Sequence, residues 1–184
     1  MKIPALLLSL ALGCAAPLAS ASNPPPHAGE QDPQIKALAP ERIEGLLAGK
    51  GLGYARAAEL NGIPGPLHVL ELADELGLSE PQRRDTQALY AQMLAQAKAL
   101  GAGLVAAEAA LDALLRGTGA DAAQVLAQLQ AIADTEARLR HTHLSAHLAQ
   151  QKLLTPAQIQ AYATLRGYHR TEAGHHHGQA DHRH

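Results

Sequence analysis

Apolar residues between positions 40 and 167 recur at intervals of three and four, the spacing of amphipathic helices. The pattern predicts three short helices, two long helices and a last short one, over about 40–49, 55–60, 66–76, 80–116, 121–152 and 156–167. Gly77 is a candidate C-cap for the third helix. Gly101 and Gly103 weaken the middle of the first long helix, where we expect a bend.

The starts of the last three predicted helices share one local signature. A residue with a side-chain oxygen is followed three positions later by Gln, so that each residue can cap a backbone N–H of the other. The pairs are Ser79 with Gln82, Asp121 with Gln124, and Thr155 with Gln158. Pro156 suits the first position of its helix. Leu154 and Ile159 occupy the two positions of a hydrophobic staple.

Two long helices joined by the short turn Gly117-Thr118-Gly119 predict an all-α fold, an antiparallel hairpin over which the shorter helices pack. Only 2% of residues are aromatic and there is no Phe or Trp, which argues against a β-sandwich and against a base-stacking surface. A net charge of −2 argues against a general nucleic-acid binder. Ala-rich helices bury little area each, so we expect a homodimer.

The two ends of the chain are typical of processed or tail segments. Lys2, a short apolar run and the small residues Ala19-Ser20-Ala21 predict a cleaved signal peptide over 1–21, and so a periplasmic protein. An alternative is lipidation at Cys14, which stands in a loose lipobox. Residues 22–39 read as a flexible segment, 40–168 as the helical domain, and 169–184 as a disordered His-rich tail. No later segment is apolar enough to span a membrane.

Polar residues interrupt the core-facing side of the second long helix. The positions Val125, Leu129, Ile132 and Leu139 share one stripe, and Glu136, His143 and His147 continue it. The pattern places His141 away from the stripe, exposed to solvent. An unpaired polar group in such a stripe costs roughly 1–3 kcal/mol, so a partner is expected.

A metal ion is one such partner. His143 and His147 lie one turn apart, and His68 and Glu71 share a face of the third helix, which Glu75 borders. Imidazole and carboxylate ligands suit Zn, Cu(II), Ni or Co. Met93 is a further soft donor, although Met at helical spacing is more often a core residue. The candidate ligands are therefore His68, Glu71, Glu136, His143 and His147 in the domain, and His175, His176, His177, His182 and His184 in the tail.

The histidines of the second long helix could equally have a purely structural role. They could hydrogen-bond Glu136, meet water beyond the end of the partner helix, or contact a dimer partner. No nucleophile motif, phosphate loop or His-Glu-x-x-His zinc motif is present, so we do not expect an enzyme.

The segments Leu78-Ser79-Glu80-Pro81-Gln82 and Leu154-Thr155-Pro156-Ala157-Gln158 resemble the paired LTxxQ motifs of the Spy/CpxP family. The second matches fully, and the first has Ser in place of Thr. The resemblance covers about 67–168. It implies a periplasmic, dimeric four-helix protein of the envelope stress response. Relatives similar to the zinc resistance-associated proteins and metal-sensor domains bind metal through His and Glu, and these are the closer likeness.

Two functions follow as hypotheses. The first is a metal-binding protein of heavy-metal or envelope stress that sequesters or senses Zn, Cu, Ni or Co. The second is an ATP-independent chaperone that holds unfolded clients, with Arg83, Arg84 and Lys98 as rim charges around an apolar patch. Contact with an envelope-stress sensor is a third alternative.

Overall fold

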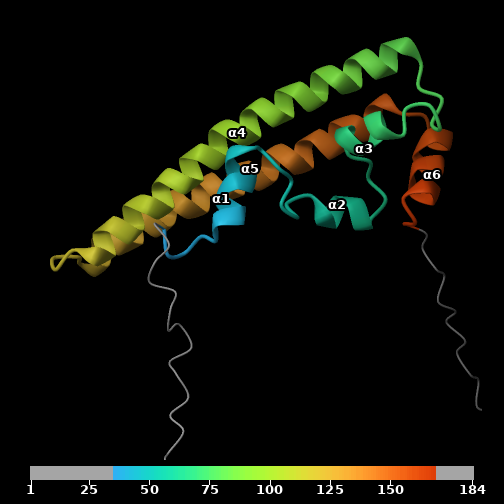
Figure 1. Cartoon of the computed structure of the whole chain (residues 1–184). Helices are drawn as coiled ribbons and strands as arrows, with labels where there is room; N and C mark the ends of the chain where they lie inside the picture. The colour runs from blue at the N-terminus through green and yellow to red at the C-terminus, as the bar shows by residue number, and fades with distance from the viewer. Residues whose placement is uncertain (1–34, 169–184) are drawn as a thin grey trace, which may run out of the picture. The chain divides into compact units, whose positions relative to one another are not determined.

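The structure is a computed structural model that describes residues 35–168, and within that range it is all-helical. Figure 1 shows its six helices: α1 (Pro40–Leu47), α2 (Arg56–Leu60), α3 (Pro66–Glu71), α4 (Glu80–Arg116), α5 (Ala122–Leu153) and α6 (Pro156–Leu165). The predicted signal peptide (1–21) and His-rich tail (169–184) lie outside the described residues. So does most of the segment 22–39.

The long helices α4 and α5 pack against each other along much of their length (Figure 1). Helix α1 packs on α4, and α3 contacts both long helices. No helix between residues 35 and 168 combines the length and the apolar character that crossing a bilayer requires. Two of the shorter helices, α1 and α3, thus pack on the long helices.

Two clusters of buried side chains hold these helices together. The first lies where α1 meets the long pair and contains Ile35, Leu38, Leu46, Tyr54, Ala97, Leu104, Ile132 and Leu139. The second joins the α3 region to α6 and contains Val69, Ala73, Leu76, Leu78, Leu154 and Tyr162. Residues 35–39, the end of the segment expected to be flexible, differ from that expectation because Ile35 and Leu38 bury their apolar side chains in the first cluster.

All three predicted capping boxes are confirmed. Ser79 Oγ accepts a hydrogen bond from the Gln82 N–H at 3.3 Å, and Gln82 Oε1 accepts one from the Ser79 N–H at 3.0 Å. Asp121–Gln124 and Thr155–Gln158 repeat the arrangement. Leu154 is buried in the second cluster and Ile159 packs against that cluster, an arrangement compatible with a hydrophobic staple.

Gln82 and Gln158 also bond to each other, and we call this pair the glutamine clasp. Each amide nitrogen donates to the other side chain's Oε1, at 2.9 Å and 3.1 Å. The Gln82 Nε2 also donates to the Leu153 carbonyl at the end of α5 (2.9 Å), and the Gln158 Nε2 donates to the Leu76 carbonyl (3.3 Å). The clasp joins the starts of α4 and α6, a contact that the capping signature alone does not reveal.

Helix α3 is shorter than predicted, because regular helix ends at Glu71 rather than near Leu76. Residues 72–77 continue as turns and close on Gly77, which has a φ of +58°. The Leu78 N–H bonds to the Ala73 carbonyl and the Gly77 N–H to the Asp74 carbonyl, the Schellman arrangement expected of a glycine C-cap. These turns bring Ala73 and Leu78 into the second cluster.

One other expectation for the long helices needs correction, and Gly101 has a packing role that its local sequence does not indicate. Leu129 is 47% exposed, because the buried part of its stripe begins one turn later at Ile132, which joins the first cluster. Gly101 lies within a continuous helix α4 and serves close packing. A Cβ at Gly101 would lie 2.7 Å from the Leu46 carbonyl carbon, so only glycine lets the end of α1 approach α4 this closely.

Candidate functional site

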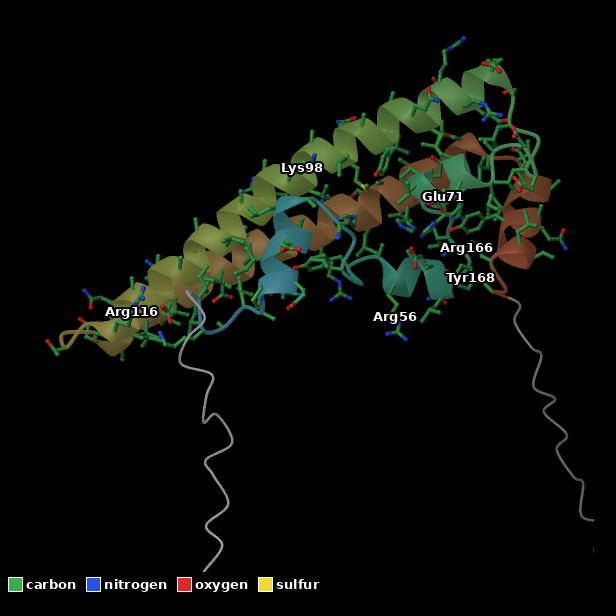
Figure 2. All side chains as sticks on the ribbon, viewed as in Figure 1. Arg56, Glu71, Lys98, Arg116, Arg166 and Tyr168 are labelled. Carbon is green, nitrogen blue, oxygen red and sulfur yellow. The ribbon has the colours of Figure 1, made fainter. Side chains whose placement is uncertain are left out.

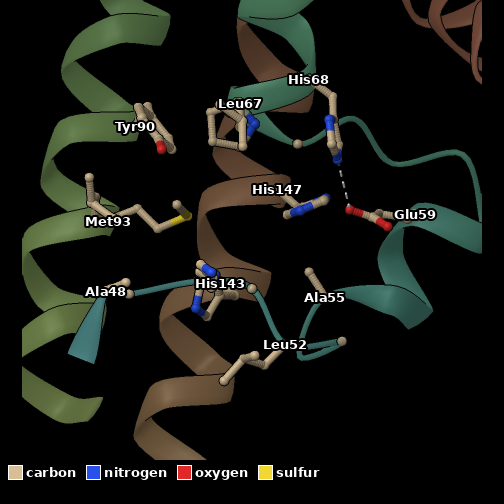
Figure 3. Close-up of a pocket in the computed structure, with 17 residues that line it drawn as sticks. Ala48, Leu52, Ala55, Glu59, Leu67, His68, Tyr90, Met93, His143 and His147 are labelled. Atoms are coloured by element: carbon tan, nitrogen blue, oxygen red, sulfur yellow. Dashed lines mark ion pairs between the residues drawn. The ribbon is translucent and has the colours of Figure 1, made fainter. Parts of the chain in front are cut away.

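A cavity of about 370 Å³ lies between α3, α4, α5 and the segment that follows α1. Three predicted ligands, His68, His143 and His147, line it together (Figure 3). His143 and His147 are buried, as their position on the helix predicted, and His141 is exposed. The structure therefore brings the α3 histidine and the two α5 histidines to one place.

His147 is held in a defined orientation at the cavity wall. Its Nδ1 lies 3.1 Å from the Ile63 carbonyl oxygen, which can only accept, so Nδ1 carries the proton and Nε2 keeps a lone pair. A Cβ at Gly65 would lie 2.7 Å from that Nε2, so the glycine leaves room for the ring. Burial lowers the pKa of His147, while the Ile63 carbonyl and Glu59 oppose that shift. The ring is therefore predominantly neutral at neutral pH.

His143 is almost fully buried. Its ring stacks on Tyr54 with the ring centroids 5.9 Å apart and the planes 9° from parallel. Its Nε2 is buried and has no hydrogen-bond partner among the described residues. Burial, and to a smaller extent the neighbouring His147, lowers the pKa of His143. Unsatisfied buried nitrogens are uncommon in proteins, so this atom needs an explanation.

Glu136 is engaged elsewhere, although it shares a stripe with the histidines. Its Oε1 accepts hydrogen bonds from Arg42 and from the Tyr54 hydroxyl, each at 3.0 Å. Burial, and then the bond to Glu136, raises the pKa of Tyr54. Glu136 does not line the cavity; it positions Tyr54 and, through the stacked rings, His143.

His68 lies between two carboxylates. Its Nδ1 is 2.7 Å from Glu71 Oε2, and its Nε2 is 3.7 Å from Glu59 Oε1, the ion pair drawn in Figure 3. Glu59 lines the cavity, whereas Glu71 approaches His68 from outside it, and Glu75 is exposed. Sequence reasoning missed Glu59 because its helix α2 is short and carries no ligand spacing of its own.

Within residues 35–168, no three His, Cys, Asp or Glu side chains are arranged as they stand to hold one metal ion. The cavity nevertheless offers three imidazoles, the Glu59 carboxylate and the Met93 thioether. The tail candidates His175, His176, His177, His182 and His184 lie outside the described residues.

No family model, curated protein or solved structure matches this chain. Its function is therefore inferred from the residues of the cavity.

Proposed function

We propose that this protein binds a transition-metal ion, Zn, Cu, Ni or Co, in the cavity between α3, α4 and α5. The observation that carries the proposal is the buried, unpartnered Nε2 of His143 in a cavity shared with His147 and His68. Neutral imidazoles are the protonation state that a metal requires, and burial holds His143 and His147 in that state.

The surroundings of the histidines resemble the outer shell of a metal site. A metal-bound imidazole usually donates its second ring N–H to a carbonyl or a carboxylate, which fixes the tautomer. His147 has such a bond to Ile63, and His68 has one to Glu71. In this arrangement Glu71, expected as a ligand, instead orients His68, and Glu59 is the carboxylate beside the ion.

The biological setting that we propose is the periplasm, reached by a cleaved signal peptide, where the protein sequesters or senses metal during heavy-metal or envelope stress. The two LTxxQ-like motifs and their resemblance to the Spy/CpxP family support this setting and a dimeric state. Because imidazole must be deprotonated to bind a metal, we expect the metal affinity to fall as the pH drops through the range in which histidine becomes protonated.

Calorimetry with Zn²⁺ and Co²⁺ tests the proposal. The parent is the full chain with all six histidines of the tail replaced by Asn, so that the tail does not contribute to the binding measured: His169, His175, His176, His177, His182 and His184. We expect one site, which His143→Gln or His147→Gln weakens at least about tenfold. His141→Gln is the matched control, because His141 lies exposed on the same helix and bonds to Ser145. A parent that binds no metal at micromolar concentrations would refute the cavity site.

A client-binding chaperone is the second candidate, and exposed apolar side chains favour it. Between residues 35 and 168, nine leucines are at least 37% exposed: Leu47, Leu52, Leu60, Leu67, Leu115, Leu126, Leu129, Leu148 and Leu165. Figure 2 shows Lys98 on α4, where it is exposed, whereas Arg83 is paired with Asp74 at 2.9 Å. Suppression of the aggregation of a denatured client without metal would support this function, and its absence at excess protein would contradict it.

A further inference from the structure

The two imidazoles of α5 face the cavity without a third nitrogen or oxygen ligand in place. Among residues 35–168, no three His, Cys, Asp or Glu side chains converge on one point. Both ring nitrogens of His68 already face carboxylates, Glu71 at 2.7 Å and Glu59 at 3.7 Å. A site built on His143 and His147 therefore needs either a rearranged His68 or a donor of another kind.

Met93 is such a donor. It lies on α4, across the cavity from the α5 histidines, and lines the same cavity while only 9% of its surface is exposed. Figure 3 shows its side chain reaching from α4 toward α5, with the sulfur at the end that faces α5. The chain has only two methionines and the other is Met1, so this is the one thioether of the helical region.

We infer that the cavity selects Cu(I), with the imidazoles of His143 and His147 and the thioether of Met93 as its three ligands, an inference that rests on the proposed metal-binding function. Thioether sulfur is a soft donor and prefers Cu(I), whereas imidazole serves several ions. Cu(I) is satisfied by three ligands, so neither His68 nor Glu59 has to leave its present partner.

The charges of the three proposed ligands favour the same ion, in a cavity whose wall also carries one anionic and one cationic side chain, Glu59 and Lys50. Leu52, Leu67 and Pro66 form part of its wall, and all three proposed ligands are neutral. The cost of transferring an ion from water into such surroundings grows with the square of its charge, so a divalent ion costs about four times as much as a monovalent one. Three neutral ligands therefore suit Cu(I), while Zn²⁺ or Co²⁺ needs a carboxylate such as Glu59.

The test compares Cu(I) and Zn²⁺ in the same variants, in the full chain with all six histidines of 169–184 replaced by Asn and Cys14, itself a soft sulfur ligand, replaced by Ser. Cu(I) affinity is measured anaerobically with ascorbate, by competition with a chromophoric Cu(I) chelator, and Zn²⁺ affinity by calorimetry. Met93→Leu removes the sulfur while nearly conserving volume. Leu104→Met is the matched control, a buried Leu–Met exchange on α4 outside the cavity.

We expect Met93→Leu to lower the Cu(I) affinity at least about tenfold, since even the loss of an outer-shell partner has that effect, and to leave the Zn²⁺ affinity nearly unchanged. Copper K-edge absorption of the parent should contain sulfur scattering that Met93→Leu abolishes and Leu104→Met retains. Equal Cu(I) affinities in parent and Met93→Leu would overturn the inference while the proposed function stands. A parent that binds neither ion would overturn both.

Discussion

Two glycines in α4 provide a sharp test of how α1 packs. Gly101 lies against the backbone of Leu46, and a Cβ there would come within 2.7 Å of the Leu46 carbonyl carbon. Gly103 is two residues further along the same helix, and a Cβ there would meet only Thr135 Cγ2, at an ordinary 3.8 Å. The same change, Gly to Ala, should therefore have opposite effects at the two positions.

The expected magnitudes follow from two terms. Replacing Gly by Ala inside a helix stabilises it by up to about 1 kcal/mol. Overpacking a core costs about 1–3 kcal/mol, and the upper end applies at Gly101 because a backbone cannot turn aside as a flexible side chain can. We expect Gly101→Ala to destabilise the protein by about 2 kcal/mol net, and Gly103→Ala to stabilise it by about 0.5–1 kcal/mol.

Urea unfolding followed by far-UV circular dichroism measures both variants. With a typical slope of about 2 kcal/mol per molar urea, the loss at Gly101 lowers the midpoint by about 1 M. The Gly103 variant controls for helix propensity and for any general effect of an added methyl group. If Gly101→Ala unfolds at the same urea concentration as the parent, or at a higher one, then the end of α1 does not press on Gly101, and the reasoning is refuted.

Two further predictions concern the histidines and the glutamine clasp. Because burial lowers the folded-state pKa values of His143 and His147 below the unfolded value of 6.5, the stability linked to them is present above that pH and is lost as the pH falls through the folded-state values. The urea midpoint of the metal-free protein should decrease as the pH is lowered from about 7.5 to about 5, and His143→Gln should weaken this pH dependence. Equal slopes of midpoint against pH in the parent and the variant would contradict the prediction. For the clasp, a double-mutant cycle of Gln82→Ala and Gln158→Ala should give a coupling energy of about 1–2 kcal/mol. Gln124→Ala, in the capping box that lacks a clasp, should cost only about 0.5–1 kcal/mol, and additive effects at Gln82 and Gln158 would contradict the coupling.

Features set by neighbouring residues could be predicted from the sequence. The capping boxes depend on side chains three positions apart, and all three are present. The burial of His143 and His147 follows from helical phase, which also leaves His141 exposed. Such features need no knowledge of what packs against the helix.

Features that depend on distant segments could not be predicted in this way. Glu59 reaches His68 only because the chain folds back between α2 and α3, and Glu136 is drawn to Arg42, which lies 94 positions earlier. The helical periodicity of α5 places Glu136 and His143 in one stripe. It does not reveal that Tyr54 contacts both, through a hydrogen bond to Glu136 and a stacked ring at His143. From the local sequence, Gly101 looks like a residue that weakens its helix. Its packing role depends on Leu46, which is distant in the sequence and contacts it only in the folded protein.

The glutamine clasp has a consequence for which amino acids can stand at its two positions. A capping box accepts Glu or Gln, because either side chain can receive the backbone N–H of the cap residue. The clasp also requires each side chain to donate, and a carboxylate has no hydrogen to give, so two glutamates there would repel instead. The same two amides join the first turns of α4 and α6 to the last turn of α5. These three helix ends should therefore open together, as one unit of hydrogen exchange.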